Sequence, residues 1–245
     1  MKLAVMQPYF FPYLGYFQLI FASDRFVAYD DVSFIKSGWI NRNRILLDGE
    51  PRFFTVPLRG ASSFVAIDRV GINEQNPRWR GRMLDTMRAA YRGARYRDAG
   101  VELLERVLAS KCESIADLAL ASVYATLEYL GISRSIARSS RAYDNRHVKG
   151  QDRILEICRK ERADVYVNAI GGVSLYQAEA FEAEGCDLKF LRSKLPEYSQ
   201  GPRRFVPGLS MLDAIMHCSP AEVTAMLPEH DLLGRRDVEE VAAHA

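Results

Sequence analysis

The sequence predicts an α/β protein with a mainly parallel, Rossmann-like sheet flanked by helices, to which a β-hairpin and a helical insertion are added. Two observations support this class. Apolar runs at residues 2–6 and 26–29 predict two strands, and the segment between them at 11–21 predicts a helix. A strand, a helix and a second strand form the unit from which parallel sheets are built. A second alternation of helices and strands, from 152 to 190, extends the same sheet.

The first unit begins with a buried strand over residues 2–6. It ends before Pro8, because proline has no N–H to donate within a sheet. Pro12 lies near the start of the helix expected over 11–21, where its missing N–H is tolerated. The second strand, 26–29, leads directly into two adjacent aspartates.

A hairpin is predicted next, because Asp48-Gly49 separates the apolar runs 44–47 and 53–58. Apolar residues at intervals of three and four predict two or three helices, in an insertion over about 75–135 that Gly131 closes. These elements make some antiparallel pairing and a helical module the expected additions to the parallel sheet.

The second alternation follows a polar loop at 139–145. It consists of a helix at 152–158, a strand at 165–167, a helix near 174–184 and a strand at 188–190. We expect one α/β domain over 1–235 and a flexible tail at 236–245. The last 15 residues, rich in charge and alanine, are predicted to form a frayed helix.

Bulk composition excludes several classes of function. The 33 basic and 31 acidic residues nearly cancel, so net charge does not indicate a nucleic-acid partner. The four cysteines are far apart and form no CxxC pair, so no metal site is predicted. The first apolar run is too short for a signal peptide or a membrane span, which predicts a cytoplasmic protein without membrane insertion. The oligomeric state is left open.

The segment from Tyr29 to Arg44 is the densest group of candidate functional residues. Asp30 and Asp31 follow a strand, where they could bind Mg²⁺, bind or deprotonate an amine, or cap a turn. Trp39 offers a stacking face. Donors for a phosphate or carboxylate, which structural salt bridges could otherwise consume, are Lys36, Asn41, Arg42, Asn43 and Arg44.

The loop after the first strand lacks the glycines of a GxGxxG or Walker motif. Its aromatic residues predict either an apolar-walled pocket with hydroxyl tips or a packed aromatic cluster. The candidate binding residues in this loop are Gln7, Tyr9, Tyr13, Gly15 and Tyr16.

Two later loops are expected at the same edge of the sheet. His147 and Asp152 have the HxxxxD spacing of some acyltransferases, and Lys149 and Arg153 are alternative phosphate contacts at a helix start. Candidate binding residues of the second loop are Asn168, Gly171, Gly172 and Tyr176. Further polar groups occur at Tyr198, Gln200, Ser210 and Asp213, although helix capping is favoured for the last two.

The segments 6–17, 29–32 and 39–45 together resemble the signature of the WbqC-like family. The similarity extends through the Asp152-Arg153 helix, Gly171-Gly172 and the segment 205–213. It implies a bacterial protein that tailors a sugar or an amine-bearing intermediate in surface-polysaccharide or specialised-metabolite biosynthesis. A fainter likeness to nucleotidylyltransferases and pantothenate synthetase lacks their HxGH element, since Gly15-Tyr16 stands where Gly-His would be.

Three functions follow from these residues. The first is a transferase that moves an acyl or aminoacyl group from a nucleotide-sugar or carrier-bound donor to the amine of a sugar or similar small molecule. Asp30 or Asp31 would bind or deprotonate the amine, and Lys36, Arg42 and Asn43 would hold the anionic donor. The second is a ligase or nucleotidyltransferase that uses ATP or another nucleotide with Mg²⁺. The third is a non-catalytic protein that binds a sugar or carrier-bound intermediate.

Overall fold

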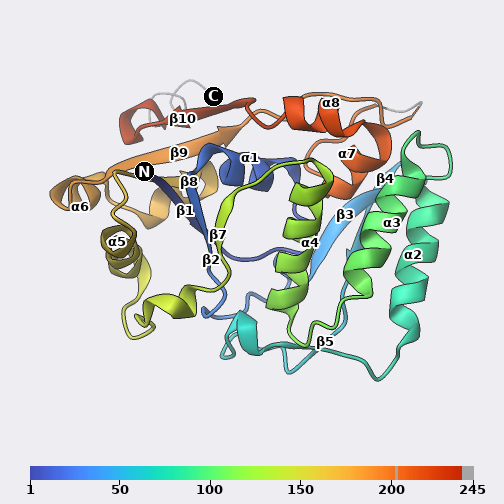
Figure 1. Cartoon of the computed structure of the whole chain (residues 1–245), viewed down its shortest axis with the longest axis horizontal. Coiled ribbons are helices and arrows are strands. Elements are labelled where there is room, and N and C mark those ends of the chain that lie inside the picture. Colours follow the sequence, from blue (N-terminus) through green and yellow to red (C-terminus); the bar gives the residue numbers. More distant parts are fainter. Residues whose placement is uncertain (202–203, 239–245) are drawn as a thin grey trace.

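The computed structural model describes residues 1–201 and 204–238 and confirms the α/β class (Figure 1). A six-stranded sheet has the order β10-β9-β8-β1-β2-β7, in which all neighbours are parallel except β10, which is antiparallel to β9. Its strands are β1 (Lys2–Met6), β2 (Arg25–Ala28), β7 (Ser135–Ala137), β8 (Val165–Ala169), β9 (Asp187–Ser193) and β10 (His230–Leu233).

Helices cover both faces of this sheet, because successive strand residues point to opposite sides. Ala4 of β1 belongs to a core that includes apolar residues of α1 (Leu14–Ala22). Leu3 and Val5 belong to a second core on the other face, which includes apolar residues of α5 (Gly150–Glu161) and α6 (Ala178–Ala183). The predicted strand-helix-strand unit is therefore confirmed.

The strand order reverses direction next to β1. From β1 the chain proceeds to β2 and β7 on one side, and then returns to place β8 on the other side of β1. The boundary between β1 and β8 is thus a topological switch point, and ligands of open α/β sheets bind outside the carboxyl ends of the strands at such a point.

The predicted hairpin is confirmed as β3 (Arg42–Leu47) and β4 (Glu50–Thr55). Asp48 and Gly49 both have positive φ, 54° and 79°, as the mirror-image hairpin turns require. A second small antiparallel pair consists of β5 (Leu58–Arg59) and β6 (Gly71–Ile72).

The helical insertion consists of α2 (Arg78–Ala90), α3 (Arg97–Leu108) and α4 (Ile115–Tyr129). It packs beside α7 (Met211–His217) and α8 (Pro220–Ala225), at the opposite end of the molecule from α5 in Figure 1. None of the helices within the described ranges is long and apolar enough to cross a membrane.

Two sequence expectations need correction. The helix near 174–184 is interrupted: a 3-10 helix spans Ile170–Leu175 and α6 begins only at Ala178. Gly172 packs so closely on Asn168 that a Cβ there would lie 2.7 Å from its amide nitrogen, which fixes a tight turn. The predicted helix of the last 15 residues is wrong at 231–233, which belong to the strand β10 and pair with β9, whereas residues 235–238 are helical. Of the predicted tail at 236–245, residues 239–245 lie outside the described residues.

Candidate functional site at the switch point

A cavity of about 610 Å³ lies at the switch point of the sheet. Gln7 follows β1, Tyr29 and Asp31 follow β2, and Tyr176 follows the 3-10 helix after β8; all of them line the cavity. Arg153 from α5 completes this set. The structure thus brings together four predicted site residues that are far apart in the sequence, together with Tyr29, which was not predicted.

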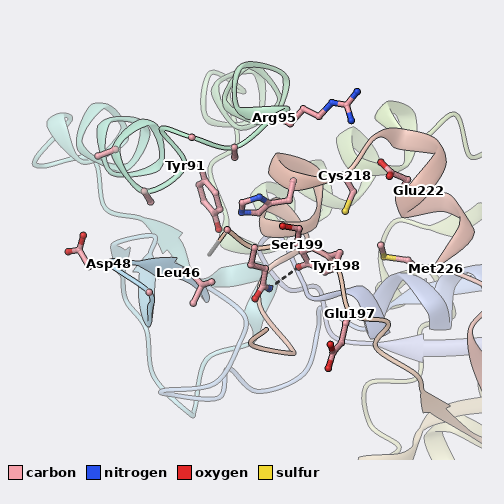
Figure 2. A pocket seen from close by; sticks show the side chains of 18 residues that line it. Leu46, Asp48, Tyr91, Arg95, Glu197, Tyr198, Ser199, Cys218, Glu222 and Met226 are labelled. Carbon is pink, nitrogen blue, oxygen red and sulfur yellow. Dashed lines mark hydrogen bonds between the residues drawn. The ribbon is translucent and has the colours of Figure 1, made fainter. Parts of the chain in front are cut away.

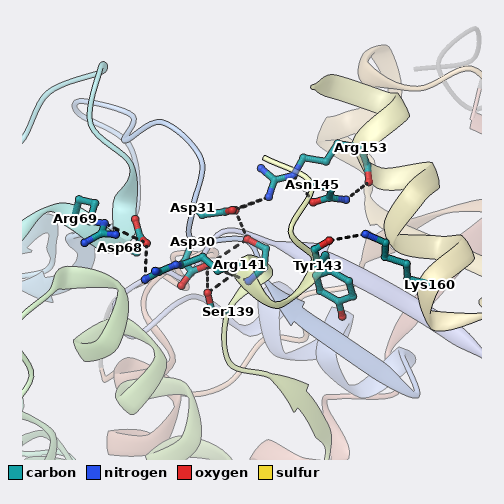
Figure 3. Close-up of polar contacts among 11 residues, drawn as sticks. Asp30, Asp31, Asp68, Arg69, Ser139, Arg141, Tyr143, Asn145, Arg153 and Lys160 are labelled. Atoms are coloured by element: carbon teal, nitrogen blue, oxygen red, sulfur yellow. Dashed lines mark hydrogen bonds and ion pairs between the residues drawn. The ribbon is translucent and has the colours of Figure 1, made fainter. Parts of the chain in front are cut away.

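Asp31 and Arg153 form a buried ion pair in the wall of this cavity (Figure 3). One guanidinium nitrogen lies 2.7 Å from each carboxylate oxygen, and both side chains are only 3% exposed. The guanidinium also donates to Asn145 Oδ1 at 3.0 Å and lies over the ring of Tyr29, 4.9 Å from its centroid. Arg153 is therefore fixed on three sides and holds Asp31 in place.

Asp30 lies behind Asp31 in a different environment. Its Oδ1 accepts hydrogen bonds from Ser139 Oγ at 2.8 Å and from the backbone N–H and Oγ of Ser140 at 3.0 and 3.2 Å. Burial raises the pKa of the Asp30 carboxyl, and the hydrogen bonds from the serines partly oppose this shift. Ser140 Oγ also donates to Asp31, so one hydroxyl contacts both carboxylates.

A third carboxylate stands beside this pair and was not singled out from the sequence. The backbone N–H of Asp68 donates to the Asp30 carbonyl at 2.9 Å. Its carboxylate lies 3.5 Å from Arg141 and 3.8 Å from Arg69. Within residues 1–201 and 204–238, however, no group of three or more His, Cys, Asp or Glu side chains is arranged to hold a metal ion.

The basic side of the cavity is formed at the start of α5. Arg146 and Lys149 are exposed and line the cavity, and Lys149 is the N-cap of the helix without a capping side-chain hydrogen bond. The first amides of the helix are therefore not capped by that side chain, and they add to the positive potential. His147 and Asp152 are also exposed in this region but are not among the lining residues.

The aromatic loop is braced from several directions at Phe11, which has a positive φ of 42°. The Phe11 carbonyl accepts hydrogen bonds from Asn43 Nδ2 at 2.7 Å and Ser210 Oγ at 2.8 Å, and its N–H donates to Ser122 Oγ at 2.8 Å. A non-glycine residue at positive φ persists only when its surroundings fix it. Asn43 and Ser210 thus hold the loop that carries Gln7.

Asn43→Ala is expected to lower the free energy of unfolding by about 1–3 kcal/mol, because it removes a buried donor to a strained carbonyl. Urea unfolding at neutral pH would measure this. The exposed hairpin residue Glu50 provides a control, since Glu50→Ala should change stability by less than about 0.5 kcal/mol. An equal effect of the two changes would contradict the bracing role.

The remaining candidates of the aromatic segment contact the loop that carries Gln7 or pack beside it. Tyr16 donates to the Gln7 carbonyl at 3.0 Å, and the rings of Tyr9 and Tyr16 lie 5.6 Å apart. Gly15 is needed for packing, because a Cβ there would lie 2.4 Å from the Tyr13 ring. These residues shape the cavity wall near Gln7, whereas Tyr9, Tyr13, Gly15 and Tyr16 do not line the cavity themselves.

The polar candidates of the segment 36–44 lie before the hairpin or on its first strand. Arg42 donates to the Gly38 carbonyl at 3.0 Å, and Arg44 donates to the Gly208 carbonyl at 3.3 Å. Asn41 donates to Val56 at 2.9 Å. Lys36 and Trp39 are exposed, and none of these candidates lines the switch-point cavity.

The candidates after β8 shape the cavity from the opposite side. Asn168 accepts from the Ala169 N–H at 2.8 Å and packs against Gly172, so it stabilises the turn, whereas Gly171 is exposed. The Tyr176 hydroxyl lies 3.3 Å from that of Tyr166. Tyr176 is the only one of these four candidates that lines the cavity.

A second, larger cavity of about 860 Å³ lies between the hairpin turn, the end of α2 and α7 (Figure 2). Tyr91, Tyr198 and Gln200 line it and all donate to the carboxylate of Asp213, which is 0% exposed. The sequence suggested that Ser210 and Asp213 cap a helix. Ser210 does cap α7, whereas Asp213 is the centre of a buried network.

The sequence missed several contributors to the switch-point site. Arg146 and Gln151 line the cavity, while Ser139, Ser140 and Asn145 orient its carboxylates and Arg153. The sequence showed that the segment 139–145 is a polar loop. Nothing in this segment indicated that it would contact Asp30, more than 100 positions earlier.

The chain matches a model of the WbqC-like protein family over residues 7–225. It is also similar to the uncharacterized protein Rv1507c of Mycobacterium tuberculosis (strain ATCC 25618 / H37Rv), with 27% identity over 224 residues that cover 88% of this chain and 93% of the relative. No solved structure matches it significantly. The family match includes every segment that lines the switch-point cavity.

Proposed function

Given that the chain belongs to the WbqC-like protein family, we propose that it is a biosynthetic group transferase acting in surface-polysaccharide or specialised-metabolite biosynthesis. In this proposal it transfers an acyl or aminoacyl group to the amine of a sugar or another small metabolite. The observation that carries the proposal is the switch-point cavity, in which Asp31 shares one space with Arg146 and Lys149. An anionic donor and a cationic acceptor find complementary groups there.

The donor binds at the basic side of the cavity. Arg146, Lys149 and the first amides of α5 contact its phosphate groups, as helix starts with basic side chains commonly do. Gln7, Tyr29 and Tyr176 supply the polar contacts that orient a small molecule. Burial raises the pKa values of Tyr29 and Tyr176, so both phenols stay protonated and can donate to a developing oxyanion.

The acceptor amine binds at Asp31. The bound ammonium first gives one proton to Asp31, and its neutral nitrogen then attacks the carbonyl carbon of the donor. A C–N bond forms, the bond from that carbon to the carrier breaks, and the second proton of the nitrogen goes to the leaving carrier group. Asp31 is paired with Arg153, and burial raises the pKa of the neighbouring Asp30 carboxyl, which favours Asp30 as the final proton acceptor. Ser140 Oγ contacts both carboxylates and can pass the proton from Asp31 to Asp30.

The double change Arg146→Met and Lys149→Met is expected to weaken binding of a phosphate-bearing donor by at least about tenfold, because each removes a charge-assisted contact. Thermal shift and titration with coenzyme A thioesters and nucleotide sugars would measure this. Arg82→Met with Arg92→Met removes the same charge at two exposed positions outside the cavity and should leave binding unchanged. Equal weakening by both pairs would refute a specific phosphate site.

The nucleotide-dependent alternative is favoured by one observation, the position of the cavity at a switch point where nucleotides bind in other α/β proteins. It predicts stabilisation by ATP or CTP that depends on Mg²⁺. Stabilisation by acyl donors or nucleotide sugars without Mg²⁺ selects direct group transfer. Ligand binding without any product on mass spectrometry, with donor and amine both supplied, selects the non-catalytic binding protein.

A further inference from the structure

Three large apolar side chains stand exposed around the switch-point cavity. Ile35, Phe64 and Leu175 are 52%, 94% and 65% exposed, and all three line the cavity. The other exposed large apolar side chains in the described part of the chain are Met1, Trp39 and Phe53. Single exposed apolar residues are ordinary, but a group of them that rims one cavity marks a binding surface.

The backbone explains why two of these side chains face the cavity together. Ser33 and Ala66 form an antiparallel bridge, and both line the cavity. Ile35 lies two residues after Ser33. Phe64 lies two residues before Ala66, in a turn in which the Val65 N–H donates to the Ser62 carbonyl at 3.0 Å. The bridge and this turn therefore hold the two segments that carry Ile35 and Phe64 beside the cavity.

The intervening residues show that core packing does not account for this rim. Phe34 lies between Ser33 and Ile35, points to the other face and is 3% exposed within the main core. Its N–H donates to the Val65 carbonyl at 2.8 Å, and Val65 packs against that same core. Phe34 and Val65 serve the fold, whereas Ile35 and Phe64 leave their apolar surface to the cavity.

The cavity thus combines an apolar part with the cationic part formed by Arg146 and Lys149. We propose that its ligand is amphiphilic, a phosphate-bearing molecule with an aliphatic chain that covers Ile35, Phe64 and Leu175. This inference rests on the proposed function for the phosphate and adds the class of the transferred or carried group. The chain comes either from an acyl donor of the coenzyme A type or from a prenyl-type lipid phosphate.

Titration calorimetry with inorganic phosphate and octyl phosphate, below micelle formation, tests the inference. Octyl phosphate is expected to bind at least about tenfold more tightly, because its chain buries apolar surface. Phe64→Ser should remove most of this gain without changing the affinity for inorganic phosphate. Phe53→Ser is the matched control, because Phe53 is 51% exposed on the hairpin and outside the cavity.

Two results would overturn the inference: equal affinities for octyl phosphate and phosphate, or equal losses in the two serine variants. Ile35→Ser provides a second variant in the same rim, so an unexpected folding defect at Phe64 would not decide the question. Octyl glucoside binding as tight as octyl phosphate would refute the phosphate site, and with it the proposed donor, while the apolar subsite would stand. Octanoyl coenzyme A and farnesyl phosphate, compared for dependence on Phe64, identify which source supplies the chain.

Discussion

Replacing Arg153 with methionine is expected to lower the free energy of unfolding by about 3–5 kcal/mol, because it leaves the buried Asp31 carboxylate without its cation. The arginine and aspartate side chains are both only 3% exposed, so the variant leaves the charge of Asp31 largely buried. The hydrogen bond from Ser140 Oγ to Asp31 alone cannot balance a buried charge. Urea unfolding followed by circular dichroism measures the loss.

The double variant Asp31→Asn with Arg153→Met separates the ion pair from packing. Removing both charges should restore much of the stability lost in Arg153→Met, because no unpaired charge remains buried. The site at Arg159 gives a control on the same helix: it is exposed and pairs with Glu184 at 3.1 Å, so Arg159→Met should cost less than about 1 kcal/mol. Additive losses in the double variant would show that Asp31 and Arg153 are not coupled.

Elements with strong local signals were predictable from the sequence. The alternation in β2 and the Asp48-Gly49 turn each encode their structure within a few residues. The strand β7 has only three residues, and its pairing with β2 supplies the order that its sequence lacks. Likewise β10 lies in a charged segment of the sequence, and the ion pair between Asp231 and Arg192 of β9 stabilises it as a strand.

The position of the candidate site could be predicted from the sequence, but the contacts between its residues could not. Asp30 and Asp31 were identified because polar residues at a strand end are typical of α/β sites. Which of them would be neutralised depended on Arg153, 122 residues away, and no local pattern encodes that contact. The same holds for Asn43, which looked like a ligand-binding amide and instead holds the Phe11 carbonyl. The roles of the other predicted site residues remain predictions.

Asp213→Ala is expected to destabilise the protein by about 2–4 kcal/mol. Tyr91 and Tyr198 donate to its two oxygens at 2.8 and 2.7 Å, and Gln200 donates at 2.9 Å. The donors come from the end of α2 and from the segment after β9, and Asp213 lies in α7, so their shared acceptor links three parts of the fold. Removing the Asp213 carboxylate leaves buried donors without an acceptor, which lowers the free energy of unfolding. Urea unfolding at pH 7 measures the loss.

Asp213→Asn is the matched comparison, because it keeps one acceptor oxygen and should cost less than half as much. Burial raises the pKa of Asp213, partly opposed by its hydrogen-bond donors, so folding favours its protonated form relative to the unfolded chain. The stability advantage of the wild type over Asp213→Asn should therefore be largest near pH 4 and decline towards pH 7. Protonation of the adjacent His217, whose pKa is lowered by burial, acts in the same direction, since it places a cation near Asp213 at low pH. An advantage that instead grows between pH 4 and 7 would show that the network lowers the pKa of Asp213 and stabilises its charge.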